Sequence, residues 1–186
     1  MFNEYADDEH QKQAEEFIME LGRFVLSFER VCDAMRYIIM FMLRDQGLSN
    51  HRMEQVLVGD KAAAELQVLL GALFCELPNQ DADDKKAVKV LLGDIKSMTE
   101  IRNILLHCSW SLGTSAAADD KELHAATVRY RAKQNSGAGT EVRGYTASYV
   151  REQSQELTRI QVLLGRLQYC VVQSGFKVST EFGRSL

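Results

Sequence analysis

The feature that most constrains the fold is an apolar repeat of helical spacing within residues 8–46. Apolar side chains return every three or four positions, which predicts one long helix, or two nearly continuous ones, with one face against a core. Gly22 is a weak point in this segment. Gly47 is suited to end it, because glycine tolerates the left-handed conformation found after helices. The repeat consists of Phe17, Leu21, Val25, Phe28, Val31, Cys32, Met35, Ile38, Ile39 and Met42.

Later segments with the same periodicity are separated by capping and turn residues. Ser49 or Asn50 can cap a short helix that extends to about Val58, and Asp60 can cap the next one. Asp81 and its acidic neighbours favour the start of a fourth helix by capping and by the helix dipole. The expected helices after the short one cover residues 61–76, 82–112 and 147–173.

The helical pattern is interrupted between residues 114 and 146. Small and polar residues predict a loop at 114–120. Residues 127–131 and 140–145 alternate in polarity at period two, and a glycine-rich turn at 135–139 separates them. This pattern predicts a β-hairpin insertion at about 125–146, before the last helix. Residues 174–186 are expected to be a loose tail.

Long antiparallel helices with short connections form up-and-down bundles. We therefore expect an all-α fold, an up-and-down bundle of four to five helices with a small β-hairpin insertion. At 186 residues the chain is expected to form a single domain over 1–186.

The charge is unevenly distributed along the chain. The formal net charge is −4, so the net charge of the protein does not attract nucleic acid. Residues 1–120 carry 12 Lys and Arg against 21 Asp and Glu, whereas residues 121–186 carry 10 against 5. A polyanion would therefore meet the C-terminal third or a local cleft. The same asymmetry also arises by chance on ordinary surfaces.

The four cysteines, Cys32, Cys75, Cys108 and Cys170, are far apart and lack the spacing of metal ligands. They could form two disulfides in a secreted protein. The acidic, polar start of the chain does not resemble a signal peptide, so we expect free thiols and a cytoplasmic location. No apolar run approaches the length of a membrane span, so no membrane association is expected.

The candidate site lies late in the fourth expected helix, at Arg102-Asn103-Ile104-Leu105-Leu106-His107. At about 100° per residue, Arg102 falls within the apolar stripe of that helix, with Asn103 and His107 side by side on its flank. A guanidinium in a core is costly unless it is paired. Arg102 therefore needs a counter-charge, or its stripe must open onto a wet groove or a partner subunit. Glu29, which is expected to interrupt the apolar face of the first helix, is the candidate structural counter-charge.

The order Arg102-Asn103, then His107, in a helical chain resembles the Arg-x4-6-His motif of the HEPN superfamily (higher eukaryotes and prokaryotes nucleotide-binding domain). In that motif a polar residue, often Asn, follows the Arg. The resemblance implies a metal-independent endoribonuclease, often found in toxin–antitoxin, antiphage or RNA-processing systems. It also implies a homodimer in which the two motif helices meet at a shared cleft. Many superfamily members serve instead as binding modules.

Carried onto this chain, the resemblance makes Arg102, Asn103 and His107 the catalytic residues. Arg102 would hold the scissile phosphate, and His107 would act as general base or acid towards the 2′-hydroxyl or the leaving 5′-oxygen. Asn103 would orient the phosphate or the imidazole, and the products would carry 2′,3′-cyclic phosphate and 5′-hydroxyl ends. Related toxins with a nucleotidyltransferase antitoxin carry a Tyr two residues after the His. Here that position is Ser109, so no cognate antitoxin is defined.

Two alternatives remain open at the level of sequence. The chain could be a non-catalytic helical regulatory or protein-interaction module, with Arg102 in a structural ion pair. The expected hairpin could bind RNA with Arg129, Arg131, Lys133 and Arg143, aided by Tyr130 and Tyr145, or it could be a solvated hairpin with ordinary aromatic packing. No paired-His, HExxH or nucleotide-loop motif occurs, so no metal site and no cofactor are expected.

Overall fold

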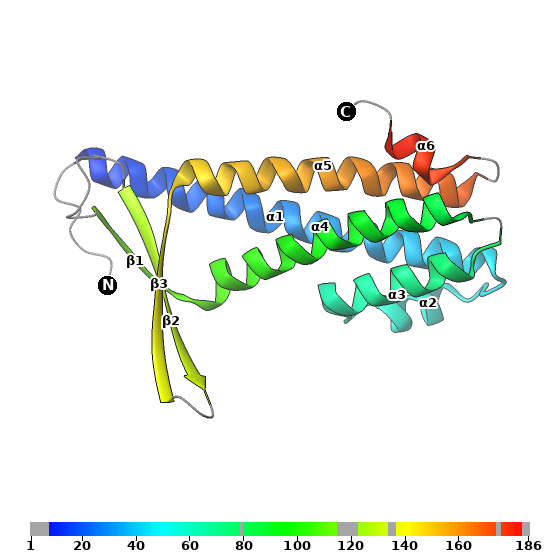
Figure 1. Cartoon of the computed structure of the whole chain (residues 1–186), viewed down its shortest axis with the longest axis horizontal. Coiled ribbons are helices and arrows are strands. Elements are labelled where there is room, and N and C mark those ends of the chain that lie inside the picture. Colours follow the sequence, from blue (N-terminus) through cyan, green and yellow to red (C-terminus); the bar gives the residue numbers. More distant parts are fainter. Residues whose placement is uncertain (1–7, 79, 115–122, 134–136, 174–175, 184–186) are drawn as a thin grey trace. The chain divides into compact units, whose positions relative to one another are not determined.

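The computed structural model describes residues 8–78, 80–114, 123–133, 137–173 and 176–183 (Figure 1). Helices make up most of this part of the chain, which confirms the expected helical bundle with a hairpin before the last long helix. The elements are α1 (Asp8–Asp45), α2 (His51–Val58), α3 (Ala63–Glu76), α4 (Ala82–His107), β1 (Ser109–Thr114), β2 (Leu123–Lys133), β3 (Gly137–Tyr145), α5 (Ala147–Val172) and α6 (Val178–Phe182).

The chain folds into two compact units, each built from segments that are distant in sequence. We call Met1–Leu26 with Ile101–Gln155 the sheet unit, and Ser27–Glu100 with Glu156–Leu186 the helical unit. The sheet unit contains all three strands, and the helical unit contains α2, α3 and α6. Helices α1, α4 and α5 each contribute a segment to both.

The helical unit has an apolar core from five helices. Full burial of one such side chain stabilises a fold by about 1.5–3 kcal/mol relative to exposure. The core side chains below are at most 3% exposed. They are Phe28, Val31, Met35, Ile38, Ile39, Met42, Leu66, Leu70, Phe74, Val88, Leu91, Ile95, Ile160, Leu164, Leu167 and Val178.

The ends of α1 and α2 follow the sequence signals. Gly47 has a φ of 94°, and the N–H groups of Gly47 and Leu48 donate to the carbonyls of Arg44 and Leu43 at 2.9 and 3.0 Å. This pair of bonds satisfies carbonyls that the helix end leaves without an internal donor. Asn50 then caps α2, since its side chain accepts from the N–H groups of the next turn.

The start of α3 differs from the expectation. The helix begins at Ala63, after Ala62, so Asp60 is not its cap. The Glu65 carboxylate instead accepts from the Ala62 N–H at 2.9 Å, which supplies half of a capping box from within the first turn. At α4 the expected acidic cap is present, because Asp81 accepts from the Asp84 N–H at 2.9 Å.

The C-terminal end of α4 is the largest correction. The helix was expected to extend to Leu112, but it ends at His107 and the chain continues as strand β1. Trp110 therefore lies on a strand rather than within the expected helix. Its indole Nε1 donates to the Leu105 carbonyl at 2.8 Å, which satisfies a carbonyl of the last helical turn.

The expected hairpin is confirmed and gains a third strand. The three strands form one antiparallel sheet in the order β1-β2-β3 (Figure 1). Trp110 pairs with Thr127, and Thr127 pairs on its other side with Arg143. Most of the expected loop at 114–120 lies outside the described residues, as does part of the turn at 135–139.

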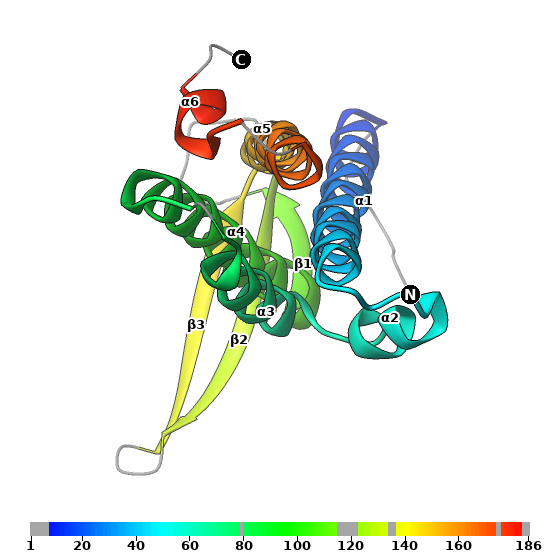
Figure 2. The same cartoon turned by 90° about the vertical axis from the view of Figure 1, so that its right-hand side faces the viewer.

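The expected loose tail contains a short helix. Helix α6 lies beside α5 (Figures 1 and 2). The Ser179 N–H donates to the buried Asp84 at 2.8 Å, and Arg166 Nη1 donates to the Glu181 carbonyl at 2.9 Å. Val178 is 1% exposed. These contacts make residues 178–182 part of the helical unit.

Candidate functional site

The last turn of α4 brings the three motif residues together in the sheet unit. Arg102 Nη1 lies 3.1 Å from His107 Nε2 and donates to Asn103 Oδ1 at 3.3 Å. Arg102 and His107 are five positions apart, so their Cα atoms do not share a helix face, and the long arginine side chain spans the difference. One guanidinium nitrogen thus joins the amide and the imidazole.

The chemistry of the donors fixes the roles in this contact. A guanidinium has five donors and no acceptor, so His107 Nε2 must be the acceptor. The ring nitrogen facing Arg102 is therefore the one able to accept a proton.

The site is open to water. Asn103 and His107 are exposed, and Arg102 is half-buried. The expectation that Arg102 lies within an apolar stripe is met only in part, because its guanidinium reaches the polar flank of the helix. A ligand with negative charge can approach all three side chains from solvent.

An aromatic group supports the helix end that carries the site. The Trp110 ring packs edge-on against Phe17, with centroids 5.3 Å apart, and lies 5.9 Å from Tyr145. Tyr145 continues to Tyr149 at 5.3 Å. Burial raises the pKa of the Tyr149 hydroxyl. The sequence could have predicted strand β1. Trp110 and Leu112 alternate with Ser109, Ser111 and Gly113, which is the period of a strand.

A second polar cluster in the sheet unit was not expected. Arg151 Nη2 and Nε donate to Glu16 at 2.6 Å and to Glu20 at 3.2 Å. The Glu20 carboxylate is buried and also accepts from Arg23 at 2.8 Å. These hydrogen bonds raise the pKa of Arg151. Every charge in this cluster has a partner, so its role is to join α5 to α1 within the unit.

Glu29, the expected counter-charge of Arg102, does not interrupt the apolar face of α1. Its side chain is exposed instead. Within the described part of the chain, Glu29 forms no ion pair. The helical repeat explains the difference, since Glu29 follows Phe28 on the solvent side of the turn.

The structure describes only part of the expected basic hairpin. Arg129, Arg131 and Lys133 lie on β2, and their side chains are outside what the structure describes. Arg143 lies on β3 and is exposed, as RNA binding requires. Tyr145 is only 9% exposed and packs against Trp110, so it does not offer its ring for base stacking. For Tyr145, ordinary aromatic packing is the correct interpretation.

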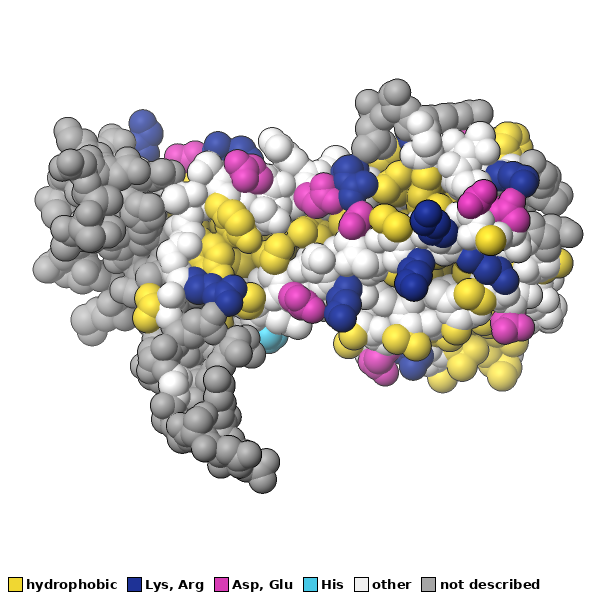
Figure 3. All heavy atoms as spheres, viewed as in Figure 1, with side chains coloured by type: hydrophobic (Ala, Val, Ile, Leu, Met, Phe, Trp, Pro, Cys, Tyr) yellow, Lys and Arg dark blue, Asp and Glu magenta, His cyan; other side chains and the backbone are white. Residues whose placement is uncertain are grey.

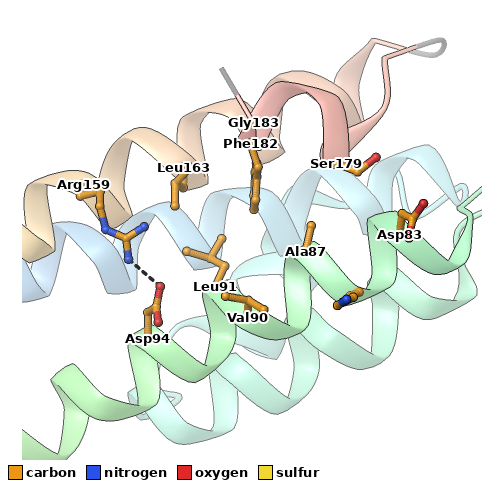
Figure 4. Close-up of a pocket in the computed structure, with 11 residues that line it drawn as sticks. Asp83, Ala87, Val90, Leu91, Asp94, Arg159, Leu163, Ser179, Phe182 and Gly183 are labelled. Carbon is orange, nitrogen blue, oxygen red and sulfur yellow. Dashed lines mark hydrogen bonds and ion pairs between the residues drawn. The ribbon is translucent and has the colours of Figure 1, made fainter. Parts of the chain in front are cut away.

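A hollow of about 410 Å³ in the helical unit is a weaker candidate. It lies among α4, α5 and α6, and Leu91, Leu163 and Phe182 are among its lining residues (Figure 4). Lys86 and Arg159 are the cations of its lining, and Arg159 is neutralised by Asp94 and Glu156, each with a shortest contact of 2.5 Å. The hydrogen bonds that Arg159 donates to Glu156 lower the pKa of Glu156, and together with the bond to Asp94 they raise the pKa of Arg159. This network joins α4 to α5.

Among the side chains that the structure describes, no group of three or more His, Cys, Asp or Glu could hold a metal ion. None of the described helices is both long and apolar enough to span a membrane. The four cysteines form no disulfide, and Cys32 and Cys170 are buried whereas Cys75 is exposed.

Comparisons with protein-family models, with curated proteins and with solved structures find no match to this chain. The geometry of Arg102, Asn103 and His107 therefore carries the functional argument. On the described surface these three residues unite a cation, an amide and an imidazole within hydrogen-bond distance at a solvent-exposed helix end.

Proposed function

We propose that the chain is a metal-independent endoribonuclease of the HEPN type. The observation that supports this is the 3.1 Å contact between Arg102 Nη1 and His107 Nε2, with Asn103 Oδ1 on the same guanidinium nitrogen. Metal-free cleavage of RNA needs a group that moves a proton and a fixed cation for the phosphate. The exposed end of α4 offers both.

In the proposed reaction the scissile phosphate binds to Arg102. Its oxygens compete for the guanidinium donors and release His107 Nε2, which then accepts the proton of the 2′-hydroxyl. The 2′-oxygen forms a bond to phosphorus and the bond to the 5′-oxygen breaks. The imidazolium of His107 in a second copy of the chain donates its proton to the leaving 5′-oxygen, and the products carry a 2′,3′-cyclic phosphate and a 5′-hydroxyl. Asn103 holds the guanidinium or the phosphate in place.

The expected size of these effects is sufficient for a useful catalyst. One positioned general base contributes about 10²–10⁴ in rate. One electrostatic donor to the developing charge contributes about 10²–10³. The two contributions are not additive, because Arg102 and His107 contact each other and act as a unit.

The reaction also supports a homodimer. Two proton transfers are needed, one from the 2′-hydroxyl and one to the 5′-oxygen, and each copy of this site has one imidazole. A second copy of the α4 end would provide the second imidazole in a shared cleft. Exposed Arg143 and the basic residues of β2 would contact the RNA backbone outside the cleft. An RNA substrate and four cysteines without a disulfide fit a toxin or defence protein of the reducing cytoplasm.

One observation favours a second candidate, a non-catalytic interaction module. Arg102 and His107 lie in the last turns of α4, where the helix dipole is negative and a nearby cation is stabilising by about 0.3–1 kcal/mol. In this role the guanidinium would serve the helix end rather than a phosphate. The same variants distinguish the two functions, because a structural role affects unfolding and a catalytic role affects cleavage.

The test is cleavage of total RNA by the purified chain in the presence of a chelator, followed by mapping of the new ends. The wild type is expected to give 2′,3′-cyclic phosphate and 5′-hydroxyl ends. Arg102→Ala and His107→Ala are expected to abolish cleavage without loss of helical circular dichroism. Arg52→Ala, which removes an exposed arginine of α2, is the matched control and should cleave as the wild type does. Equal cleavage by wild type and the double variant would reject the proposal.

A further inference from the structure

A second surface feature lies in the helical unit, apart from the residues of the proposed reaction. Helices α3 and α4 enclose a groove of about 450 Å³. Its floor is apolar, with Phe74 fully buried and Val88 2% exposed. The helices approach closely at Gly71, where an added Cβ would lie 3.0 Å from Leu92 Cδ1. The groove is therefore a preformed binding site for apolar side chains.

One wall of the groove is basic. Lys85, Lys86 and Lys89 of α4 line it and are exposed. Lys96 continues the row, because positions 85, 89 and 96 fall on one helix face at a spacing of four and seven. Figure 3 shows basic side chains following one another along α4, with hydrophobic side chains beside them.

The other wall is apolar and exposed. Val68 of α3 is 74% exposed, and Cys75, which lines the groove, is exposed as well. Ala64 and Ala72 lie on the same exposed face at helical spacing. This wall carries no charge between Glu65 and Glu76, so it offers apolar contact along about three turns.

The lysines have no carboxylate partner in the part of the chain that the structure describes. The ion pairs found there involve Lys61 and Lys177 but none of Lys85, Lys89 or Lys96. Asp84, the nearest buried carboxylate in sequence, accepts instead from the Ser179 N–H. A row of unpaired cations beside an apolar groove is complementary to a ligand with an acidic edge and an apolar face.

We propose that this groove docks an acidic amphipathic helix of a partner protein. Lys96 follows Lys85 by 11 positions, or about 16.5 Å at 1.5 Å per residue, which matches a partner helix of about three turns. Apolar residues of the partner at i, i+3, i+4 and i+7 would fill the groove, and its Asp and Glu residues would face Lys85, Lys89 and Lys96. RNA fits this surface less well, because the floor and the α3 wall are apolar and uncharged.

The probe for the test is an acetylated and amidated peptide of Leu, Glu and Ala, about 16 residues long, with leucine at i, i+3, i+4 and i+7 spacing. Its affinity for the full chain is measured by fluorescence anisotropy at low ionic strength. Protection of Cys75 from alkylation, with half-buried Cys108 as the internal reference, reports whether the peptide occupies the groove. Saturable binding that protects Cys75 is the expected result.

Two variants with equal loss of charge separate the groove from general electrostatics. The triple variant Lys85→Gln/Lys89→Gln/Lys96→Gln is expected to weaken binding about tenfold, since three exposed ion pairs are lost. The matched variant Lys12→Gln/Arg30→Gln/Arg52→Gln removes three exposed cations elsewhere and should leave the affinity within about twofold. Val68→Glu, at an exposed position of the apolar wall, should also abolish binding.

Three outcomes would overturn the proposal. The first is equal binding of a peptide in which Lys replaces every Glu. The second is an equal loss of affinity in both triple variants. The third is lysine-dependent protection of Cys75 by sodium dodecanoate but not by the peptide, which would make the groove a site for an alkyl carboxylate instead.

Discussion

The Glu54 carboxylate is fully enclosed and is held on both oxygens by Arg44, with Nε to Oε1 at 2.7 Å and Nη2 to Oε2 at 2.7 Å. His51 Nδ1 also contacts Glu54 Oε2 at 3.0 Å. The bond from Arg44, followed by that from His51, lowers the pKa of Glu54 from 4.5 to about 2. This fork ties the short helix α2 to the end of α1.

The contacts of Arg44 and His51 with Glu54 predict that the fold becomes less stable in acid. A carboxyl group whose pKa is lower in the folded than in the unfolded chain stabilises the fold above the unfolded value, here 4.5, and loses that contribution as the pH falls towards 2. We expect the melting temperature of the wild type to fall over this range. The melting temperature of Glu54→Gln should fall less, because position 54 then carries no titrating group. Thermal melts at pH 7, 4.5 and 3 measure the effect. Glu76→Gln, an exposed carboxylate of α3, is the control and should keep the wild-type slope.

Arg102→Lys tests whether the proposed site needs a guanidinium or only a charge. Lysine keeps the cation but cannot donate in a planar fork to Asn103 and a phosphate together. We expect RNA cleavage to fall about 10²–10³-fold, with unfolding by urea nearly unchanged. Full activity of Arg102→Lys would show that the 3.1 Å geometry is irrelevant to the reaction. Arg30→Lys, at an exposed position of α1, controls for general effects of the exchange.

The indole of Trp110 is expected to hold the end of α4. Trp110→Phe keeps an aromatic ring near Phe17 but removes the donor to the Leu105 carbonyl. The expected cost is about 1 kcal/mol in the free energy of unfolding, the usual net value of one hydrogen bond. Urea unfolding followed by far-ultraviolet circular dichroism measures it, because Trp110 is the only tryptophan. An unchanged midpoint, equal to that of the exposed control Tyr37→Phe, would contradict this role.

The helical core could be predicted well because it depends on one repeat. The pattern in α1 identifies Phe28, Val31 and Met35, which are all buried. It omits Phe24, which is fully buried, and includes Leu21, which is half-buried. Apolar residues spaced every three or four positions only approximate the 3.6-residue period of the helix. Over about ten turns the apolar stripe therefore rotates around the helix, and a pattern set at one end no longer identifies the buried positions at the other.

The candidate site could be predicted only in part. The spacing places Arg102 and His107 on one helix. A helical-wheel projection gives only the direction of each side chain and not its length, so it does not predict that the Arg102 guanidinium reaches His107 Nε2. The predicted helix also extended through Trp110. Strand β1 begins two residues after α4 ends, and no proline or glycine lies between them to mark the end of the helix. Tertiary contacts of the indole, which depend on Phe17 far away in sequence, decide that boundary.

Two glycines of the first helical segment predict opposite responses to alanine. Gly47 has a φ of 94°, where a Cβ is strained, so Gly47→Ala is expected to destabilise the chain by about 1–2 kcal/mol. Gly22 lies within α1, and a Cβ there would meet nothing within 4 Å. Gly22→Ala is therefore expected to stabilise the chain by roughly 0.5–1 kcal/mol, because alanine loses less backbone entropy in a helix. Urea unfolding of both variants beside the wild type tests the pair, and a loss of stability in Gly22→Ala would show that its surroundings are more crowded than the described residues indicate.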